Sequence, residues 1–497
     1  MATKFQNFIN GKWVDAASGR TFENRNPARW DEVVGVFPKS GNEDVNAAVK
    51  SAREAFERWR LVPAPKRGDI MRNVGDLMVA RKEDLARQMT REMGKVLAET
   101  RGDVQEGIDT AYYAAGEGRR LFGNTVPSEL PDKFNMAMRV PIGVAGIVTP
   151  WNFPMAIPTW KIFPALLCGN TVVFKPASDT PATATSLVEI LAEAGIPDGV
   201  VNIVHGGGGE VGMAIVGHPD VDCVSFTGST LVGKTISEVA GRTLKRVSLE
   251  LGGKNAQIVM DDADLTLALD GVLWGAFGTT GQRCTATSRL ILHEKIHDRF
   301  LEMLLDRVRK LRLGDGLLAE TEVGPCVNKS QQDTVADYVR IGQEEGARLL
   351  TGGSVPKGKG LDGGWFYSPT VFAGVKPGHR IAREEIFGPV LSVLEARSLD
   401  EAVTMLNDTV YGLSSSIYTA NINAAYRAIR DIRAGITYIN APTIGAEAHM
   451  PFGGVKQTGN GHREGGWTVY DFFTEWKTVY IDYSGGLQRA QIDNYAK

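Results

Sequence analysis

Short apolar runs alternate with helix-like segments from about residue 142 onward. The runs GVAGIVT, TVVFK, VVNIV, DCVSFT and AQIVM are separated by helical stretches such as 181–194 and 229–240. Such alternation is typical of parallel strands joined by crossover helices. The pattern starts again after residue 284 with RLILH, a helix near 295–312, PVLSVLE and SSSIYT. The sequence therefore predicts an α/β fold with two such units.

The N-terminal region is predicted to be helical. Apolar residues at helical spacing predict a helix over 43–59 that opens after Asn42, and a second helical stretch is expected through roughly 64–92, ending near Gly94. A chain of 497 residues is long for one core, so two or three domains are expected. No long Gly/Ser linker separates them, which indicates short, ordered crossings.

Composition and charge exclude several classes of protein. Hydrophobic residues at 43% and charged residues at 23% are typical of a soluble globular protein. The net charge of −3 indicates neither a nucleic-acid partner nor an acidic membrane surface. The most apolar region, 142–174, is interrupted by prolines and polar residues and so predicts no membrane span.

The cysteines and the N-terminal residues indicate the cellular compartment in which the protein is expected. Cys168, Cys223, Cys284 and Cys326 have no paired spacing, which indicates free thiols in a reducing environment. The start MATKFQNFINGKW has no apolar run behind a basic segment, so no signal peptide is expected. We therefore expect a cytoplasmic protein.

Three residues together predict covalent chemistry on a carbonyl group. Cys284 in GQRCTA supplies a nucleophile, Glu250 in LELGGKN a base for water, and Asn152 in PWNFP an amide donor for an oxyanion. Cys284 lies in a Gly- and Thr-rich stretch before a strand, where backbone N–H groups are expected to lower its pKa. The other three cysteines lie in apolar runs or beside proline and are interpreted as structural.

A P-loop pattern competes with this interpretation. Residues 228–235, GSTLVGKT, fit GxxxxGK[ST] between a strand-like and a helix-like segment, and IVMDD at 258–262 resembles a Walker B strand. An ATPase is therefore an alternative. The physical content of the motif is a strand, a glycine turn and a helix N-terminus that can bind an anion, which a dinucleotide pyrophosphate satisfies as well as a triphosphate.

The string HEKIH at 293–297 fits the HExxH pattern of zinc proteases. That pattern binds zinc only when both histidines lie on one helix face. His293 closes the apolar run RLILH and is expected to end a strand, whereas His297 is expected in the following helix. We therefore predict no metal site.

The ordered motifs PWNFP, GNTVVFKPA, FTGST, LELGGKN, GQRCTA, EEIFGPV and PFGGVKQTG resemble those of the aldehyde dehydrogenase superfamily along the whole chain. The resemblance implies that Cys284 attacks an aldehyde, that Asn152 and the Cys284 N–H hold the oxyanion, and that Glu250 activates the water that hydrolyses the thioester. It also implies that Lys161 and Glu475 relay the proton from Glu250. Lys234 and Thr235 would then be coincidental helix residues.

The resemblance implies NAD or NADP as the cofactor. The positions that match cofactor contacts are Trp151, Lys175, Ser178, Gly228, Ser229, Gly252, Glu385 and Phe387. NAD-selective relatives often have Glu where this chain has Ser178, and a carboxylate there would repel a 2′-phosphate. We therefore expect that NADP is accepted, with Lys175 close enough to pair with the phosphate.

The strings NAPTIGAEAHMPFGG and GGLQRAQID resemble the antiquitin-like branch and its α-ketoglutaric semialdehyde dehydrogenase relatives. In that branch an Arg before the nucleophile and a helix Glu contact the substrate, and Arg283 and Glu106 match them. The expected substrate is a semialdehyde with a distal carboxylate, α-ketoglutaric semialdehyde first. Aminoadipic semialdehyde and broad-range aliphatic aldehydes are alternatives.

Two alternative functions within the same fold remain. A CoA-acylating relative typically lacks the deacylating Glu, which is present here as Glu250. A non-catalytic structural role would tolerate loss of the nucleophile or its helpers, yet Cys284, Glu250 and Asn152 are all retained.

The resemblance also implies three structural parts. A Rossmann-like NAD(P)-binding domain would take 1–120 and 142–252, and an α/β catalytic domain 253–453. A small β oligomerisation element with the C-terminal tail would take 121–141 and 454–497. In this last part WKTVYIDYS is typical of an edge strand that pairs with a neighbour's sheet, so a homodimer or homotetramer is expected.

Overall fold

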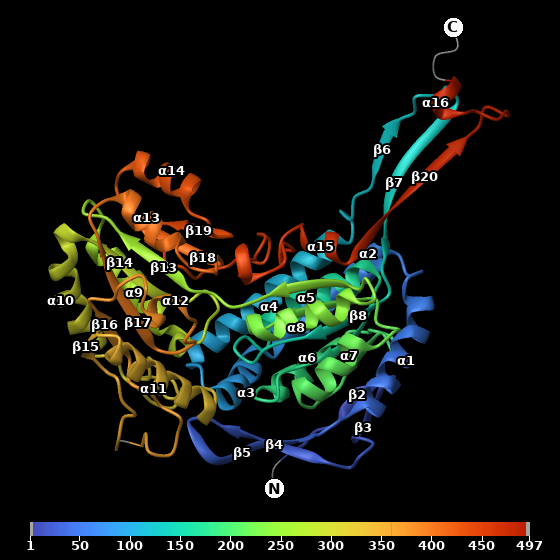
Figure 1. The fold of residues 1–497 in the computed structure, drawn as a ribbon. Coiled ribbons are helices and arrows are strands. Elements are labelled where there is room, and N and C mark those ends of the chain that lie inside the picture. The colour runs from blue at the N-terminus through green and yellow to red at the C-terminus, as the bar shows by residue number, and fades with distance from the viewer. Residues whose placement is uncertain (1–2, 359, 494–497) are drawn as a thin grey trace.

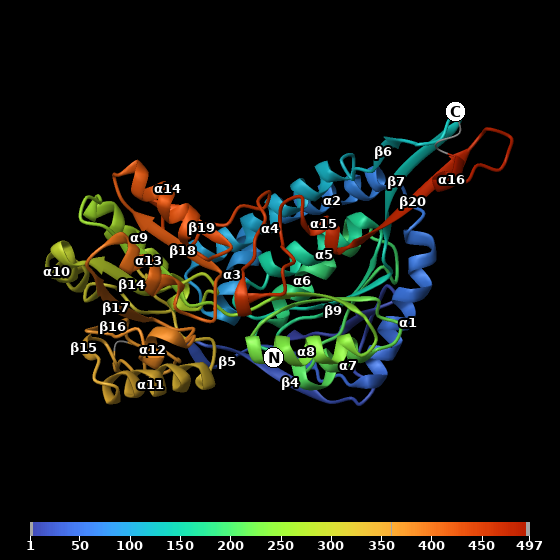
Figure 2. The ribbon, with the colours of Figure 1, turned by 45° about the horizontal axis from the view of Figure 1, so that its top comes forward.

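Two lobes, each containing a seven-stranded sheet, lie side by side, and a three-stranded arm projects from one of them (Figures 1 and 2). The computed structural model describes residues 3–358 and 360–493. The predicted α/β architecture is confirmed. No helix among the described residues is long and apolar enough to cross a membrane.

The first lobe is built on a sheet with the order β12-β11-β8-β9-β10-β2-β3. The five strands from β12 to β10 are parallel, and β2 and β3 are added antiparallel at one edge. Four of the predicted apolar runs are the strands β8 to β11. The bounds are β2 (Asn7–Ile9), β3 (Lys12–Val14), β8 (Val144–Val148), β9 (Thr171–Lys175), β10 (Val201–Ile203), β11 (Cys223–Thr227) and β12 (Arg246–Glu250).

Helices cover both faces of this sheet (Figure 2). The predictions for 43–59, 181–194 and 229–240 are confirmed as α1, α6 and α8. The bounds are α1 (Asn42–Trp59), α2 (Ala64–Ala80), α3 (Lys82–Met93), α4 (Leu97–Glu117), α5 (Ala156–Cys168), α6 (Pro181–Glu193), α7 (Met213–Gly217) and α8 (Thr230–Gly241).

The helical stretch predicted over roughly 64–92 consists of two helices, α2 and α3, which are separated at Arg81. Arg81 leaves helical geometry at φ −108° and ψ 9°, and its guanidinium pairs with Glu193 of α6. Neither Pro nor Gly marks this break in the sequence. The predicted end near Gly94 is confirmed, since Gly94 adopts the left-handed conformation at φ 89°.

The second lobe has a sheet with the order β15-β16-β17-β14-β13-β18-β19, parallel except for β15. Its strands are β13 (Asn255–Val259), β14 (Thr287–His293), β15 (Arg348–Thr351), β16 (Thr370–Ala373), β17 (Val390–Ala396), β18 (Ser414–Tyr418) and β19 (Ile436–Ile439). Its helices are α9 (Leu265–Phe277), α10 (His297–Val308), α11 (Lys329–Glu344), α12 (Arg380–Arg383), α13 (Leu399–Asn407) and α14 (Ile422–Asp431).

The two histidines of HEKIH lie as predicted. His293 is the last residue of β14, and His297 is the first residue of α10. They therefore do not share a helix face. Within residues 3–358 and 360–493 no group of three or more His, Cys, Asp or Glu residues has the arrangement of a metal site.

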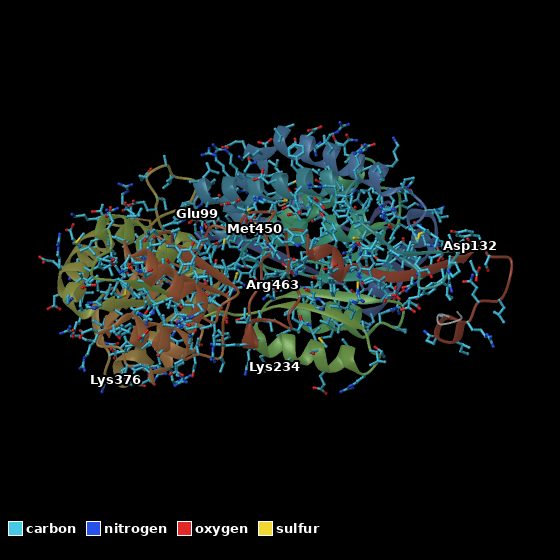
Figure 3. The ribbon with its side chains drawn as sticks, turned by 90° about the horizontal axis from the view of Figure 1, so that it is seen from above. Glu99, Asp132, Lys234, Lys376, Met450 and Arg463 are labelled. Carbon is cyan, nitrogen blue, oxygen red and sulfur yellow. The ribbon has the colours of Figure 1, made fainter. Side chains whose placement is uncertain are left out.

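The arm is a sheet with the order β20-β7-β6, in which all neighbours are antiparallel. As predicted, WKTVYIDYS forms an edge strand, and Asp132 in Figure 3 marks the arm. The bounds are β6 (Asn124–Pro127), β7 (Lys133–Pro141) and β20 (Thr474–Asp482), and the flanking helices are α15 (Val469–Phe472) and α16 (Ala490–Asp493).

A further sheet, β1-β5-β4, runs along the lower edge of Figure 1, with β1 (Thr3–Lys4), β4 (Thr21–Asn26) and β5 (Arg29–Pro38). The core of the first lobe joins both ends of the chain, because Phe8 and Phe473 belong to it. The segment 469–473 of the predicted terminal region therefore packs in that core and not in the arm. The domain boundaries stay a prediction, and residues 1–2 and 494–497 lie outside the described chain.

Candidate active site

Cys284 lies where two cavities meet. The first, the substrate-side cavity, has a volume of about 220 Å³, and the second, the cofactor-side cavity, has a volume of about 230 Å³. Cys284 lines both, together with Thr227 and Leu251. The cysteine is half-buried and free. A single thiol can therefore reach a molecule bound on either side.

The loop that carries Cys284 is fixed by contacts from distant segments. Asn255, the first residue of β13, donates its side-chain amide to the Cys284 carbonyl at 2.8 Å and to the Ala286 carbonyl at 2.9 Å. The Gln282 side chain accepts from the Val327 N–H at 2.9 Å. Just before the loop, Thr279 and Thr280 adopt positive φ angles of 51° and 58°. Since such angles are costly for threonine, the surrounding contacts must hold this turn.

Asn152 lies beside the nucleophile as predicted. It follows β8, is only 2% exposed, and lines the cofactor-side cavity with Cys284. Its side-chain Nδ2 donates to the Gln282 carbonyl at 3.2 Å. Because β8, β11 and β12 are parallel, the residues that follow them meet at one edge of the sheet, which brings Asn152, Gly228 and Glu250 together.

The electrostatic environment of Cys284 differs from the prediction. Burial, followed by the charges of Glu385 and Glu250, raises the pKa of the Cys284 thiol to about 12. A hydrogen bond from the Thr285 backbone lowers the pKa as expected, but the other effects outweigh it. The predicted lowering of the Cys284 pKa is therefore wrong. The resting group is a neutral thiol that needs a proton acceptor.

Glu250 is the last residue of β12 and lines the substrate-side cavity. Its side chain is buried, and neither carboxyl oxygen has a side-chain hydrogen-bond partner among the described residues. Burial, then the nearby charge of Glu464, raises its pKa well above the ordinary value, and Lys161 opposes this shift. A carboxylate with a raised pKa is a stronger base, which suits proton abstraction from water or thiol.

Lys161 is buried on α5 and pairs with Glu464, not with the predicted Glu475. The Lys161 Nζ also donates to the Ser225 hydroxyl at 3.0 Å. Glu464 is held by two backbone hydrogen bonds to Phe452, of 2.6 and 2.7 Å. The structure thus assembles a buried group of Glu250, Lys161 and Glu464.

The placement predicted for Glu475 is wrong. Glu475 lies on the arm strand β20 with 60% of its side chain exposed, and the nearest cation is Arg246 at 3.9 Å. Sequence reasoning missed Glu464, although one signal was available. In GHREGG this carboxylate stands beside glycines and close to the motif PFGGVKQTG. Only the long-range contact with Lys161 shows that it faces the site.

Six of the eight residues predicted to contact the cofactor line the cofactor-side cavity. They are Trp151, Gly228, Ser229, Gly252, Glu385 and Phe387. The cavity also contains Gln331, which the sequence did not indicate. Gln331 donates to the Ile386 and Phe387 carbonyls at 3.0 Å each and so holds Phe387 at its positive φ of 58°.

At two glycines of this cavity the backbone leaves no space for a side chain. A Cβ atom on Gly228 would lie 2.4 Å from the Phe226 ring, and one on Gly252 would lie 2.3 Å from a Glu385 oxygen. Ser229 caps α8, with its hydroxyl accepting from the Val232 N–H at 3.4 Å. A glycine turn before a helix N-terminus fits the pyrophosphate of a dinucleotide.

Glu385 lines the cofactor-side cavity. One of its carboxyl oxygens accepts from the Gly253 N–H at 2.9 Å, and burial raises its pKa to about 7. The buried Lys254 opposes that shift, and its own pKa is lowered to about 7 by burial. At neutral pH the Glu385 carboxyl group can therefore accept hydrogen bonds when it is ionised and donate one when it is protonated.

Lys175 and Ser178 lie outside the cavity lining, at the carboxyl end of β9 and beyond it. Lys175 is 4% exposed, and burial lowers its pKa to about 8. The Ser178 hydroxyl donates to the Gly206 carbonyl at 3.1 Å. Ser178 thus lies beside Gly206 and Lys175 lies near Gly212, at the same edge of the sheet as the glycine turn at Gly228.

The P-loop residues do not assemble a triphosphate site. The Lys234 Nζ donates to the Gln457 side chain at 2.8 Å, and the Thr235 hydroxyl donates to the Leu231 carbonyl. Asp261 follows β13, which belongs to the other seven-stranded sheet. In a P-loop ATPase the Thr and the Walker B Asp bind the same magnesium ion, so this separation argues against the ATPase.

The substrate-side cavity has mostly apolar walls, which include Phe153, Trp160, Trp274 and Phe452. Both predicted substrate residues, Arg283 and Glu106, line it with Cys284. Arg283 donates from Nε to the Thr279 hydroxyl at 2.8 Å and from Nη2 to Glu99 at 3.2 Å. Figure 3 shows Glu99 and Arg463 between the two lobes, whereas Lys376 lies at the outer edge of one.

Comparisons with known proteins agree with this site. The model of the "Aldehyde dehydrogenase family" matches residues 13–479. The chain is 44% identical to an alpha-ketoglutaric semialdehyde dehydrogenase of Bacillus subtilis, over 96% of this chain and 98% of that one. It is 44% identical to an alpha-ketoglutarate semialdehyde dehydrogenase of Haloferax volcanii, over 97% and 100%.

A solved structure is also similar along nearly the whole chain. The crystal structure of the NAD-dependent aldehyde dehydrogenase from Sinorhizobium meliloti superposes with a TM-score of 0.95. The two chains are 42% identical, and the match covers 98% of this chain and 96% of that one. Together with the arrangement around Cys284, these matches establish that the chain belongs to the aldehyde dehydrogenase family.

Proposed function

We propose that the protein oxidises an aldehyde to a carboxylic acid through covalent intermediates on Cys284, with NAD or NADP as hydride acceptor. The observation that carries this proposal is that one thiol lines both the substrate-side and the cofactor-side cavity. An aldehyde carbon bound to that sulfur would lie at the boundary between the two cavities. The bound nicotinamide would accept the hydride.

The residues around Cys284 suit the first half of the reaction. The thiolate attacks the carbonyl carbon, and the oxygen becomes anionic. The Asn152 amide and the Cys284 N–H are the donors that would hold this oxyanion. Loss of hydride from the tetrahedral carbon leaves a thioester on Cys284. Because burial keeps the resting thiol neutral, its proton must pass to a base, and Glu250 lines the same cavity.

Glu250 would act again in the second half, when water hydrolyses the thioester. The carboxylate removes a proton from water, which attacks the acyl carbon and releases Cys284. The buried Lys161–Glu464 pair lies next to Glu250, and both groups influence its pKa. We assign to Lys161 and Glu464 the relay of that proton away from Glu250.

The proposed substrate is a semialdehyde with a distal carboxylate, and α-ketoglutaric semialdehyde is favoured. Arg283 supports this class, because its guanidinium lines the cavity and can pair with a carboxylate. The names of the relatives from Bacillus subtilis and Haloferax volcanii point to the same compound. Aminoadipic semialdehyde and simple aliphatic aldehydes are the alternatives.

The choice between NAD and NADP is proposed to depend on Ser178. A serine here places no negative charge near a 2′-phosphate, and Lys175 at the end of β9 supplies a nearby cation. We therefore propose that NADP is accepted as well as NAD.

We also propose a homodimer or homotetramer formed through the arm. The strand β20 has a free edge, and its side chains Trp476, Tyr480 and Ile481 are 46–65% exposed. Apolar groups of this size on an edge strand are typical of pairing between subunits. The four cysteines are free thiols, which supports a location in the cytoplasm.

The test follows NAD(P)H formation with a panel of aldehydes, with the wild type beside Cys284→Ala. The panel contains α-ketoglutaric, aminoadipic and succinic semialdehydes and propanal, each with NAD and with NADP. We expect reduction that Cys284→Ala abolishes and the highest kcat/KM for α-ketoglutaric semialdehyde. Cofactor reduction that survives Cys284→Ala would contradict the mechanism, and equal kcat/KM for propanal would contradict the substrate class.

A further inference from the structure

Helix α4 contacts two segments that flank the proposed oxyanion donors. The Asn152 loop, residues 149–155, connects β8 to α5, and the nucleophile loop, residues 278–286, connects α9 to β14. Two carboxylates of α4 each accept one backbone N–H, Asp103 from the first residue of α5 and Glu99 from the nucleophile loop. Because they are four residues apart, they lie one turn apart on the same face of α4. The helix is therefore a common support for both loops.

Asp103 caps α5 from another helix. Met155, at the position before α5, makes no side-chain hydrogen bond to the helix. The Oδ1 atom of Asp103 instead accepts from the Ala156 N–H at 2.7 Å. The first N–H groups of a helix have no partner within it, and a negative charge there is favourable. Asp103 thus supplies the cap that the local sequence lacks, and so fixes the point where the Asn152 loop ends.

Lys95 holds the same loop at a second point. Its Nζ pairs with Oδ2 of Asp103 at 2.8 Å, and both side chains are fully buried. The same Nζ lies 3.5 Å from the centroid of the Phe153 ring, which belongs to the residue directly after Asn152. An ammonium over an aromatic face is attracted to it, and more strongly when water is excluded. The ion pair therefore anchors the chain on both sides of a short segment that begins at Asn152.

The nucleophile loop has its own anchor on α4. Glu99 accepts from the Thr279 N–H at 2.7 Å, where Thr279 adopts a positive φ of 51°. The two loops also touch directly, since the Asn152 Nδ2 donates to the Gln282 carbonyl at 3.2 Å. A shift of the Asn152 loop on α4 would therefore change the position of its amide relative to the Cys284 N–H.

The Lys95–Asp103 pair is better suited to fixing geometry than to adding stability. Both charges lose their hydration, so a buried ion pair often stabilises a fold no more than apolar side chains of similar size. Its hydrogen bonds are directional, however, and each oxygen of Asp103 has a donor of its own.

We propose that Asp103, neutralised by Lys95, is a positioning residue that sets the distance between the two oxyanion donors, the Asn152 amide and the Cys284 N–H. This inference rests on the proposed function, since it requires the Asn152 amide to hold the oxyanion. Asp103 and Lys95 are assigned no contact with the reacting atoms, and their effect on the rate passes through Asn152.

The test measures NADH formation in a single turnover, with enzyme and NAD in excess over propanal. The variant Lys95→Met/Asp103→Leu removes the acceptor and both charges together, so no charge is left buried alone. We expect its rate to fall about 30-fold with an unchanged KM for NAD, because a misplaced donor loses much of its stabilisation of the oxyanion. Lys95→Met/Asp103→Asn keeps an acceptor for the Ala156 N–H and should stay within about threefold of the wild-type rate.

A double-mutant cycle separates positioning from a general structural role. In an Asn152→Ala background the change Lys95→Met/Asp103→Leu should alter the rate less than about twofold, because the group that it positions is absent. A general structural role would lower the rate by the same factor in both backgrounds. The matched control is Glu83→Gln/Arg101→Met, which removes an exposed ion pair of α4 with a distance of 2.8 Å and should keep the wild-type rate.

A further variant covers the case in which Lys95→Met/Asp103→Leu does not fold. Asp103→Glu retains the ion pair but moves the carboxylate by one methylene. Its single-turnover rate should fall about tenfold, and this loss should also disappear in the Asn152→Ala background. Thermal unfolding of each variant checks that the fold is retained.

Three results would overturn the inference: a wild-type rate in folded Lys95→Met/Asp103→Leu, a loss of full size in the Asn152→Ala background, or equal losses with Asn and with Leu at position 103. Failure of the proposed function looks different. In that case Asn152→Ala alone would form NADH at the wild-type rate, which would overturn both. If only the inference fails, Asn152→Ala is slow.

Discussion

The two cavities that meet at Cys284 are built by different means. On the cofactor side part of the wall is glycine backbone, where Gly228 and Gly252 lie against Phe226 and Glu385 with no space for a side chain. On the substrate side the walls are side chains, including a network of ion pairs from α4 and the nucleophile loop. A cofactor shared by many enzymes is held by features of the fold, whereas the substrate is selected by replaceable side chains.

Because the two cavities are built differently, we predict that a variant in one cavity changes the binding of the molecule on that side and leaves binding on the other side unchanged. A change at the shared centre should affect every substrate and both cofactors. A change at Arg283 should mainly alter the oxidation of aldehydes with a distal carboxylate. A change beside β9 should alter only the choice of dinucleotide.

Glu250→Gln should give the largest effect. Removal of the general base should lower kcat about 10³-fold for every aldehyde, since hydrolysis of the thioester loses its proton acceptor. Rapid quench should show acyl-enzyme accumulating on Cys284 if attack still proceeds. A loss confined to acidic semialdehydes would contradict the assignment of Glu250 to the shared centre.

Arg283→Met should lower kcat/KM for α-ketoglutaric semialdehyde about 10²-fold, because a charge-assisted contact to the carboxylate is lost. The kcat/KM for propanal should fall much less, and the KM for NAD should not change. Steady-state kinetics with the two aldehydes measures the ratio. Equal losses for both aldehydes would mean that Arg283 only supports the loop of Cys284.

Glu464→Gln should lower kcat about tenfold and reduce the free energy of unfolding by about 3 kcal/mol, because Lys161 is left buried without its anion. The pH–rate profile supplies a second readout. Since the charge of Glu464 raises the pKa of Glu250, its removal should shift the rising limb to lower pH. Glu475→Gln, on the exposed arm strand, is the matched control and should leave rate, profile and stability unchanged.

Ser178→Glu should give the smallest and most selective effect. The new carboxylate should raise the KM for NADP by about tenfold through repulsion of the 2′-phosphate, and change the KM for NAD much less. Aldehyde specificity should stay as in the wild type. A similar increase in both KM values would indicate a steric effect and exclude charge as the basis of the choice.

The sequence predictions succeeded for residues whose position follows from the local sequence, and they failed for residues whose role depends on long-range contacts. Asn152, Gly228, Ser229 and Cys284 were placed correctly, because each follows a parallel strand or a tight turn whose local pattern is readable. Glu464 was missed, since its role depends on a contact with Lys161, 303 positions away. The direction of the Cys284 pKa was missed for a related reason. Backbone donors near a cysteine are local, whereas its burial and the charges of Glu385 and Glu250 arise only on folding.

The break between α2 and α3 is a further example. Nothing in the residues around Arg81 indicates an interruption, and the partner of its guanidinium, Glu193, lies on another helix. The two sheets were predictable in their existence, because strand and helix periods alternate clearly. Their strand order was not, since pairing joins segments such as β2 and β10 that are far apart in the chain.

The joining of both chain ends in one core has a consequence for biosynthesis. Phe8 and Phe473 pack in the same core, while every strand of the second sheet lies between Asn255 and Ile439. On the ribosome the second lobe can therefore complete its sheet before the first lobe can close its core. Lys161 likewise has no ion-pair partner until Glu464 has been synthesised. Cys284 is therefore synthesised long before its catalytic surroundings are complete. A chain released before residue 464 would carry the nucleophile without that carboxylate.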